Sequence, residues 1–369
     1  MKVKTAYSTK KDTQALTAEI KEQIGNFDAR LVVFFASPDI EPSKISADMQ
    51  NAFPAASTMG CSSSGEIVTG KMLDKSVVAM AFGPEIIANC KIEVLSGIKH
   101  NNGQVDSAME SFGDYYGIPA SDLSPDEFIG MVLIDGLSLQ EENINERIGD
   151  LTNVTFIGGS AGDDLAFEQT YIYANGETYT EAAVLALIKS NTPFDVLKTQ
   201  SFEATDKKAV VTKADEPNRK VMEINNKPAT EAYAELVGVS EEKVGDTFFQ
   251  HPIGLVFQDN IFVRSPQRAQ DKNIHFYCSI KEGMELNLLN SEDIVRFTRD
   301  ALEEKVDEMG GVSAIVNFNC ILRTLELKDK GQTDQYGEIF NSFPTVGFST
   351  YGESYIGHIN QTATMLLFK

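Results

Sequence analysis

The residues best suited to bind a small molecule lie in a glycine-rich turn that occurs near both ends of the sequence. Residues 60–70 (GCSSSGEIVTG) align without a gap on residues 347–357 (GFSTYGESYIG). Free backbone N–H groups with Ser and Thr hydroxyls can hold a carboxylate, and the shared glutamate can accept hydrogen bonds from an ammonium group. This combination predicts a site for an amino acid or a similar zwitterion. A turn whose glutamate only satisfies neighbouring donors explains the same residues.

A weaker third copy of the turn, GGSAGD at residues 158–163, raises the possibility of catalysis. It contains the Gly-x-Ser-x-Gly pattern of a hydrolase nucleophile, centred on Ser160. A nucleophile elbow is followed by an amphipathic helix, whereas Asp163 and Asp164 come next here. We therefore favour a tight glycine turn between two strands and expect no enzymatic activity. A hydrolase that uses Ser160 or Cys61 is the less favoured alternative.

Further polar side chains stand just after apolar runs that are typical of strands. Asp135 and Ser138 follow residues 128–134, and acids at the carboxyl ends of strands often line ligand sites in α/β sheets. Arg323 follows residues 314–318 and could pair with a carboxylate. A turn-forming Asp-Gly pair and a surface ion pair are the respective alternatives. The candidate ligand-binding residues are Cys61, Ser62, Ser63, Glu66, Asp135, Ser138, Ser160, Asp163, Arg264, Arg323, Ser349, Thr350 and Glu353.

The four histidines have no spacing typical of metal ligands, so we expect no metal site. His251 precedes a proline in an apolar setting, where a single histidine can ligate a haem iron. A hydrogen-bonded histidine without a cofactor is the more common explanation. Haem is therefore a possible cofactor, and none is certain.

Composition excludes several classes of partner. The 369 residues carry a formal net charge of -22 without a basic run, which disfavours nucleic acid and anionic membranes. The four cysteines are far apart and indicate a reducing compartment. The sequence shows neither a signal peptide nor a run of membrane-spanning length. We expect a cytoplasmic protein without membrane insertion.

The elements that position these residues form repeated strand, helix, strand units. Residues 12–24 form a helical pattern with Asp12 as its cap, and the apolar run 31–36 is followed by a second helix at 43–53. Residues 128–134, 140–148 and 154–158 repeat this plan. We predict an α/β fold of two domains, residues 1–200 and 201–369, built from repeated β-α-β-turn-β lobes whose sheets are covered by helices.

An ordered set of segments resembles the FIST family of sensory proteins, over nearly the whole chain from about residue 30. The two predicted domains would be its N-terminal and C-terminal FIST domains. The segments that carry the resemblance are residues 31–38 (LVVFFASP), 60–66 (GCSSSGE), 135–138 (DGLS), 158–164 (GGSAGDD), 251–255 and 263–266 (HPIGL and VRSP), 319–323 (NCILR) and 347–353 (GFSTYGE).

The resemblance implies a bacterial-type input module for signal transduction that binds a small ligand, proposed for the family to be amino acids or their derivatives. The resemblance also implies that such modules are often fused to, or encoded beside, histidine kinases, cyclic-dinucleotide enzymes or chemotaxis receptors. Some members are haem-based nitric oxide sensors, and by analogy His251 would be the axial ligand. Because the sequence ends at Lys369, just after its last predicted strand, we expect it to signal through a separate partner.

Overall fold

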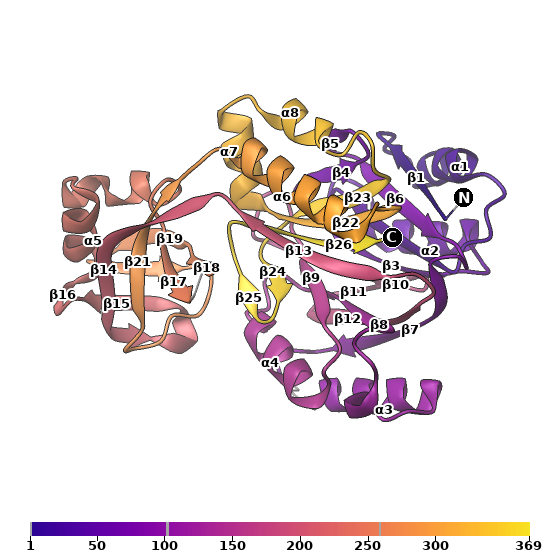
Figure 1. The fold of residues 1–369 in the computed structure, drawn as a ribbon, viewed down its shortest axis with the longest axis horizontal. Helices are drawn as coiled ribbons and strands as arrows, with labels where there is room; N and C mark the ends of the chain where they lie inside the picture. Colours follow the sequence, from indigo (N-terminus) through magenta and orange to yellow (C-terminus); the bar gives the residue numbers. More distant parts are fainter. Residues whose placement is uncertain (1, 101–102, 258–259) are drawn as a thin grey trace. The chain divides into compact units, whose positions relative to one another are not determined.

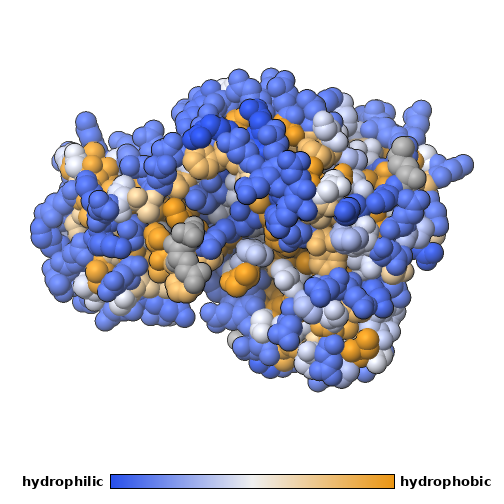
Figure 2. Space-filling model, viewed as in Figure 1, coloured by the Kyte–Doolittle hydropathy of each residue, from blue (hydrophilic) through white to orange (hydrophobic). Residues whose placement is uncertain are grey.

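A computed structural model describes residues 2–100, 103–257 and 260–369 (Figure 1). The chain forms two compact units. Unit 1 comprises residues 1–198, 299–358 and 363–369, and unit 2 comprises residues 199–298 and 359–362. The predicted α/β fold class is confirmed. Helices alternate with strands along the chain and pack on mixed and antiparallel sheets. The visible face of the molecule is mostly hydrophilic, in keeping with its charge (Figure 2).

Unit 1 contains three six-stranded sheets with the same plan. The strand order of sheet 1 is β1 (Val3–Ser8), β6 (Val77–Phe82), β2 (Leu31–Ala36), β3 (Ser57–Ser62), β10 (Ile172–Ala174) and β11 (Glu177–Tyr179). In sheet 2 the order is β7 (Ile87–Ser96), β12 (Ala182–Ser190), β8 (Phe128–Ile134), β9 (Phe156–Ser160), β24 (Glu353–Tyr355) and β25 (His358–Ile359). In sheet 3 it is β13 (Phe194–Gln200), β26 (Thr362–Phe368), β22 (Ala314–Cys320), β23 (Thr345–Thr350), β4 (Glu66–Val68) and β5 (Lys71–Leu73).

Each sheet is organised around one parallel pair, β2–β3, β8–β9 or β22–β23, with helices in the connection. The first strand of each pair also bonds an antiparallel strand that comes later in the chain, β6, β12 or β26. A parallel pair requires a crossover connection, which the intervening helices supply. We number the three lobes 1, 2 and 3 after their sheets. Each lobe carries one copy of the glycine-rich turn at the same position, where β3, β9 or β23 ends.

The hairpin that follows each turn leaves its own lobe and completes the sheet of another. Hairpin β4–β5 bonds β23 in sheet 3, hairpin β10–β11 bonds β3 in sheet 1, and hairpin β24–β25 bonds β9 in sheet 2. The exchange is cyclic, so each lobe gives one hairpin and receives one. The three turns are therefore brought together by the topology itself.

The inner faces of the three sheets share one hydrophobic core, to which each central strand contributes alternate residues. Phe35 of β2 stacks on Phe348 of β23, with ring centroids 4.4 Å apart, and meets Phe318 of β22 edge-on. Because side chains of a strand alternate between its two faces, the outer faces need separate cover. Helices provide it.

Sheet 1 is covered by α1 (Thr13–Ile24) and α2 (Pro42–Ala52), and sheet 2 by α3 (Gln104–Tyr116) and α4 (Glu141–Leu151). In sheet 3, α7 (Ile321–Asp329) packs on the parallel pair and α8 (Thr333–Glu338) on β5. Asp12 caps α1 as predicted, since its Oδ1 accepts the N–H of Ala15 at 2.9 Å. The remaining helical segments are α6 (Ile294–Met309) and the short 3₁₀ turn Ala120–Asp122.

Unit 2 is a separate strand-rich body with its own core around α5 (Ala229–Val237). Its sheet has the order β18 (Asn260–Arg264), β17 (Ile253–Phe257), β21 (Glu285–Ser291), β14 (Phe202–Asp215), β15 (Lys220–Ile224), β20 (Asn273–Phe276) and β19 (Pro266–Gln270), with β16 (Lys227–Pro228) beside β15. Its 3₁₀ turns are Glu216–Asn218 and Glu241–Thr247.

Candidate functional site

The three copies of the glycine-rich turn meet in unit 1 and form what we call the turn junction, residues 60–66, 158–164 and 347–353. Each copy is hydrogen-bonded to both others through the main chain. The bonds run from the N–H of Ser64 to Ser349 O (3.2 Å), of Ser349 to Gly65 O (2.8 Å), of Gly162 to Ser62 O (3.1 Å), of Ser160 to Gly352 O (2.8 Å) and of Tyr351 to Ser160 O (3.0 Å). A displacement of one turn must therefore move or strain the other two.

Glycine is required at the junction because the turns approach each other closely. A Cβ atom on Gly162 would lie 2.3 Å from the Oγ of Ser64, in another lobe. A Cβ on Gly136, which follows β8, would lie 2.1 Å from the carbonyl oxygen of Ala161. A Cβ atom at either position would require the neighbouring atoms to shift.

The two glutamates of the close turn copies are fully buried and hydrogen-bonded near their own turns. Glu66 accepts from the hydroxyls of Ser63 and Ser76 and from the N–H of Ser76. Glu353 accepts from the hydroxyl of Thr350. Burial raises the pKa of Glu66 to about 7, although its three hydrogen bonds favour the ionised form. That these acids contact a ligand stays a prediction.

In the third turn copy, Asp163 organises a loop of unusual backbone conformation, which we call the Asp163 loop (residues 163–169). Its carboxylate accepts the N–H groups of Phe167 (3.0 Å), Glu168 (2.7 Å) and Gln169 (3.0 Å). Asp164, Leu165 and Phe167 all have φ between +53° and +67°. Bulky residues in this region are outliers, each costing about 1–3 kcal/mol, and they concentrate at ligand clamps and switches.

The Asp163 loop rests on side chains from the other two lobes. The hydroxyl of Tyr351 donates to Asp163 and accepts the N–H of Leu165 at 2.7 Å. The Oγ of Ser64 accepts the N–H of Asp164 at 3.0 Å. The ring of Phe167 stacks on that of Tyr351, with centroids 5.2 Å apart, while Phe167 remains 49 % exposed. The loop thus joins all three lobes and still offers an aromatic ring to the solvent.

Two ion pairs lie close enough to Asp164 of the Asp163 loop to act on its carboxyl group. The Nζ of Lys75 lies 3.5 Å from Asp39, and that of Lys328 lies 2.7 Å from Asp74. All four groups act on Asp164, whose pKa is raised first by partial burial and then by the charges of Asp39 and Asp74. These are the charges that a zwitterion needs, although none of the four side chains was among the candidates.

Arg323 lies on α7 beneath the turn of sheet 3, in a fully buried polar cluster. Its Nε donates to the Oδ1 of Asn319 at 3.0 Å, which also accepts the hydroxyl of Tyr336 at 3.0 Å. Thr324 joins this cluster to the predicted Ser349, with hydroxyl oxygens 2.7 Å apart. The candidates Arg323 and Ser349 therefore belong to one hydrogen-bonded cluster. The residues that connect them, Asn319 and Thr324, were not among the candidates.

The other candidates take different positions. Cys61 points into the apolar core, and burial raises the pKa of its thiol well above the usual range, which leaves it a poor nucleophile. The hydroxyl of Ser160 faces Glu141 at 3.4 Å. Asp135 accepts from Leu137 N–H, Thr170 Oγ1 and Glu181 N–H, and Ser138 donates to the Asp135 carbonyl. Ser62 accepts the N–H of Tyr171.

Two candidates belong to unit 2. Arg264 ends β18. His251 follows the 3₁₀ turn Glu241–Thr247, and its Nδ1 lies 3.0 Å from the Oδ1 of Asn290, while Tyr233 donates to its carbonyl oxygen. A hydrogen bond to Nδ1 is what an ordinary structural histidine makes, and it leaves Nε2 as the nitrogen that could face an iron. Haem ligation by His251 stays a prediction.

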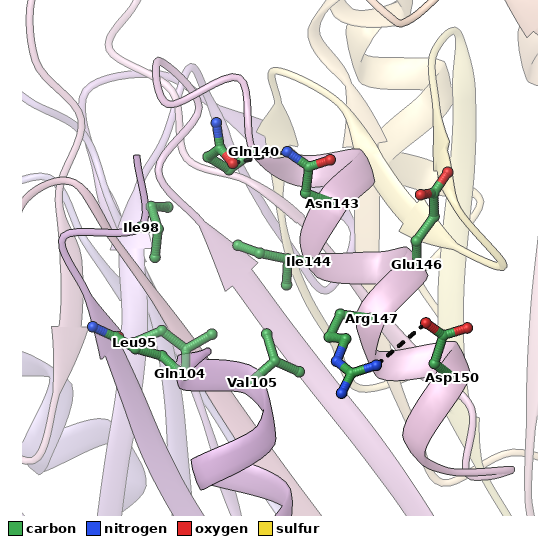
Figure 3. Close-up of a pocket in the computed structure, with 10 residues that line it drawn as sticks. All are labelled: Leu95, Ile98, Gln104, Val105, Gln140, Asn143, Ile144, Glu146, Arg147 and Asp150. Carbon is green, nitrogen blue, oxygen red and sulfur yellow. Dashed lines mark hydrogen bonds and ion pairs between the residues drawn. The ribbon is translucent and has the colours of Figure 1, made fainter. Parts of the chain in front are cut away.

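A hollow of about 280 Å³ lies between α3 and α4 at the edge of sheet 2 (Figure 3). Four apolar side chains face one another across it, Leu95, Ile98, Val105 and Ile144. Polar groups occupy both ends, and they are Gln104, Gln140, Asn143, Glu146, Arg147 and Asp150. None was predicted. The helical spacing of Val105, Ala108, Met109 and Phe112 could have revealed α3, but only the fold brings α3 beside α4.

Comparison with known proteins identifies the family of the chain. The family model of the FIST N domain matches residues 30–227, and that of the FIST C domain matches residues 229–355. The chain belongs to the FIST family, as its motifs suggested. An uncharacterized protein of Methanocaldococcus jannaschii is 25% identical over 316 residues, which are 80% of this chain and 60% of that protein. The match thus spans less than two thirds of the relative's length.

FIST domains are associated with small-ligand sensing in signal transduction. Within residues 2–100, 103–257 and 260–369, no helix has the length and apolar character needed to cross a bilayer. The same ranges contain no group of three or more His, Cys, Asp or Glu side chains that could hold a metal ion.

Proposed function

We propose that this protein senses an amino acid or a similar small zwitterion, which it binds at the rim of the Asp163 loop, and that it relays the signal to a separate partner. The observation that carries the proposal is the strained loop itself. Three bulky or charged residues in the left-handed region are held there by Asp163, Tyr351 and Ser64. Strain of this kind persists where the surrounding structure enforces it, which is common at ligand clamps.

The groups around the loop support a zwitterion as the ligand. Lys75 and Lys328 supply positive charge for a carboxylate, and Asp39 and Asp74 supply negative charge for an ammonium group. Phe167 provides an apolar face for the side chain of the ligand. From the original candidates, the proposal keeps Asp163 as the organiser of the loop. In this proposal the buried Ser160, Glu66 and Glu353 support the loop from beneath and do not contact the ligand.

The turn junction supplies a route for the signal. Because the Asp163 loop is bonded to lobes 1 and 3 as well as its own, a ligand that shifts the loop changes the balance between two arrangements of all three lobes. The partner would read that change. By the family resemblance, a histidine kinase, a cyclic-dinucleotide enzyme or a chemotaxis receptor is the class of partner to test.

Phe167→Ala tests the proposal with Phe257→Ala as its matched control. Phe257 is 63 % exposed and lies in unit 2, so the same change is made outside the Asp163 loop. Thermal unfolding of the full chain is followed against single amino acids. A ligand at about a hundred times its Kd adds roughly 2.7 kcal/mol. The stabilisation is expected in the wild type and in Phe257→Ala, and its loss is expected in Phe167→Ala.

Two outcomes would contradict the proposal. One is a panel in which no amino acid stabilises the wild type. The other is a ligand whose stabilisation survives in Phe167→Ala, which would place its site elsewhere. Because Phe167 is half-exposed, the folded structure itself should survive the change, and circular dichroism checks this.

A further inference from the structure

The hollow between α3 and α4 has the form of a slot with an apolar middle and two different polar ends (Figure 3). At one end the amide of Asn143 donates to Gln140 at 2.9 Å. At the other end lies Arg147, the one cation among the described residues that line the slot. None of these residues belongs to the turn junction or to the Asp163 loop. A ligand of this slot would therefore be separate from the one proposed above.

Arg147 is held by a carboxylate that comes from the other helix. Its Nε donates to the Oδ2 of Asp106 at 3.0 Å and its Nη2 to the Oδ1, so the two side chains form a bidentate pair between α4 and α3. Asp150 lies 3.5 Å from Nη1. The hydrogen bond from Arg147 keeps the pKa of Asp106 below its usual range. Arg147 thus already presents the planar geometry that suits a carboxylate, beside an apolar slot.

We propose that the slot binds small carboxylic acids with an apolar body, whose carboxylate takes the place of Asp106 on Arg147. The apolar body would lie among Ile98, Val105 and Ile144. This inference does not depend on the proposed function, because it uses a different part of lobe 2. It also predicts a consequence for the fold: a bound acid breaks the pair that joins α3 to α4.

Asp106 then acts as an internal competitor that sets the affinity of the slot. A carboxylate on the same chain has a high effective concentration, in the millimolar range for flexible links, so an external acid must overcome it. The carboxylate of the external acid would make the same two hydrogen bonds to Arg147 as Asp106 does. The apolar contacts of the external acid must therefore supply the free energy that favours it over Asp106. Removing the charge of Asp106 should therefore tighten binding, although such a change weakens a structural ion pair.

The test uses hexanoate as the probe and hexanamide as its neutral counterpart, titrated calorimetrically into the full chain. Hexanoate is expected to bind the wild type weakly and to bind Asp106→Asn about tenfold more tightly. Arg147→Lys keeps the charge but loses the bidentate geometry, so it should bind hexanoate more weakly than the wild type. Asp114→Asn makes the same change at an exposed position about two turns further along α3 and should leave the affinity unchanged.

Three results would overturn the proposal. The first is equal binding of hexanamide and hexanoate, which would indicate a merely apolar slot. The second is an affinity that Asp106→Asn does not raise. The third is the absence of hexanoate binding in both the wild type and Asp106→Asn. Thermal unfolding of each variant confirms that it is folded before its affinity is compared.

Discussion

Among the individual residues, Glu66 is a buried acid whose protonation should couple the stability of the fold to pH. Burial raises its pKa from 4.5 to about 7, so the folded protein binds a proton that the unfolded chain releases between these values. The free energy of unfolding must therefore fall as the pH rises through this window, by roughly 3 kcal/mol if Glu66 acted alone. At lower pH the carboxyl is protonated in both states and the penalty vanishes.

Glu66→Gln tests this pH dependence. An amide cannot ionise, so the loss of stability between pH 4.5 and pH 7 should be smaller in the variant than in the wild type. Urea unfolding at several pH values measures the difference between the two proteins, which removes the contribution of other titrating groups. Glu110→Gln, on an exposed surface, serves as the control. Parallel curves for the wild type and Glu66→Gln would show that Glu66 does not titrate in this range.

The sequence was informative about residue types but not about how their hydrogen bonds are used. Glycines, hydroxyls and acids recurred at fixed spacing, which located the turns that meet in the junction. Spacing alone could not show that Ser63 and Ser76 occupy the acceptors of Glu66. Nor could it show that Tyr351 would support a loop nearly two hundred residues earlier. Such contacts depend on the fold, because their partners are distant in the chain.

At the scale of the elements, replacing glycine by alanine should have opposite effects on stability in the turns and in the helices. Gly162→Ala should destabilise the protein by about 1–3 kcal/mol, because its Cβ would overlap the Oγ of Ser64 where three lobes meet. Gly149→Ala, in α4 with no atom near its Cβ position, should stabilise it by about 0.5–1 kcal/mol. Equilibrium unfolding in urea compares both with the wild type. Equal effects of the two substitutions would contradict the close approach at the junction.

Periodicity predicted the buried elements better than the amphipathic or irregular ones. The apolar runs 31–36 and 128–134 are β2 and β8 with the expected bounds, because fully buried strands are continuous apolar segments. Residues 253–264 contain the antiparallel pair β17 and β18, and their apolar pattern does not show where the first strand ends. The helix α3, with only four buried positions, was missed.

At the scale of the molecule, the exchange of hairpins makes unit 1 depend on both ends of the chain. A fragment of residues 1–227, the part that contains the FIST N match, should not fold alone. Hairpin β4–β5 would lose β23, and β9 would lose β24. Unpaired strand edges promote aggregation. Circular dichroism and size-exclusion chromatography of the fragment test this. Cooperative unfolding of a monomeric fragment would show that the exchanged hairpins are dispensable.

The most direct test of the sensing proposal is hydrogen exchange of the amides in residues 164–169, measured with and without the amino acid that stabilises the protein most. Three of these amides donate to Asp163, so their exchange reports the opening of the loop. We predict that the ligand slows exchange in this segment in the wild type and in Phe257→Ala, but not in Phe167→Ala. Protection confined to other segments, with exchange at 164–169 unchanged, would contradict the proposal.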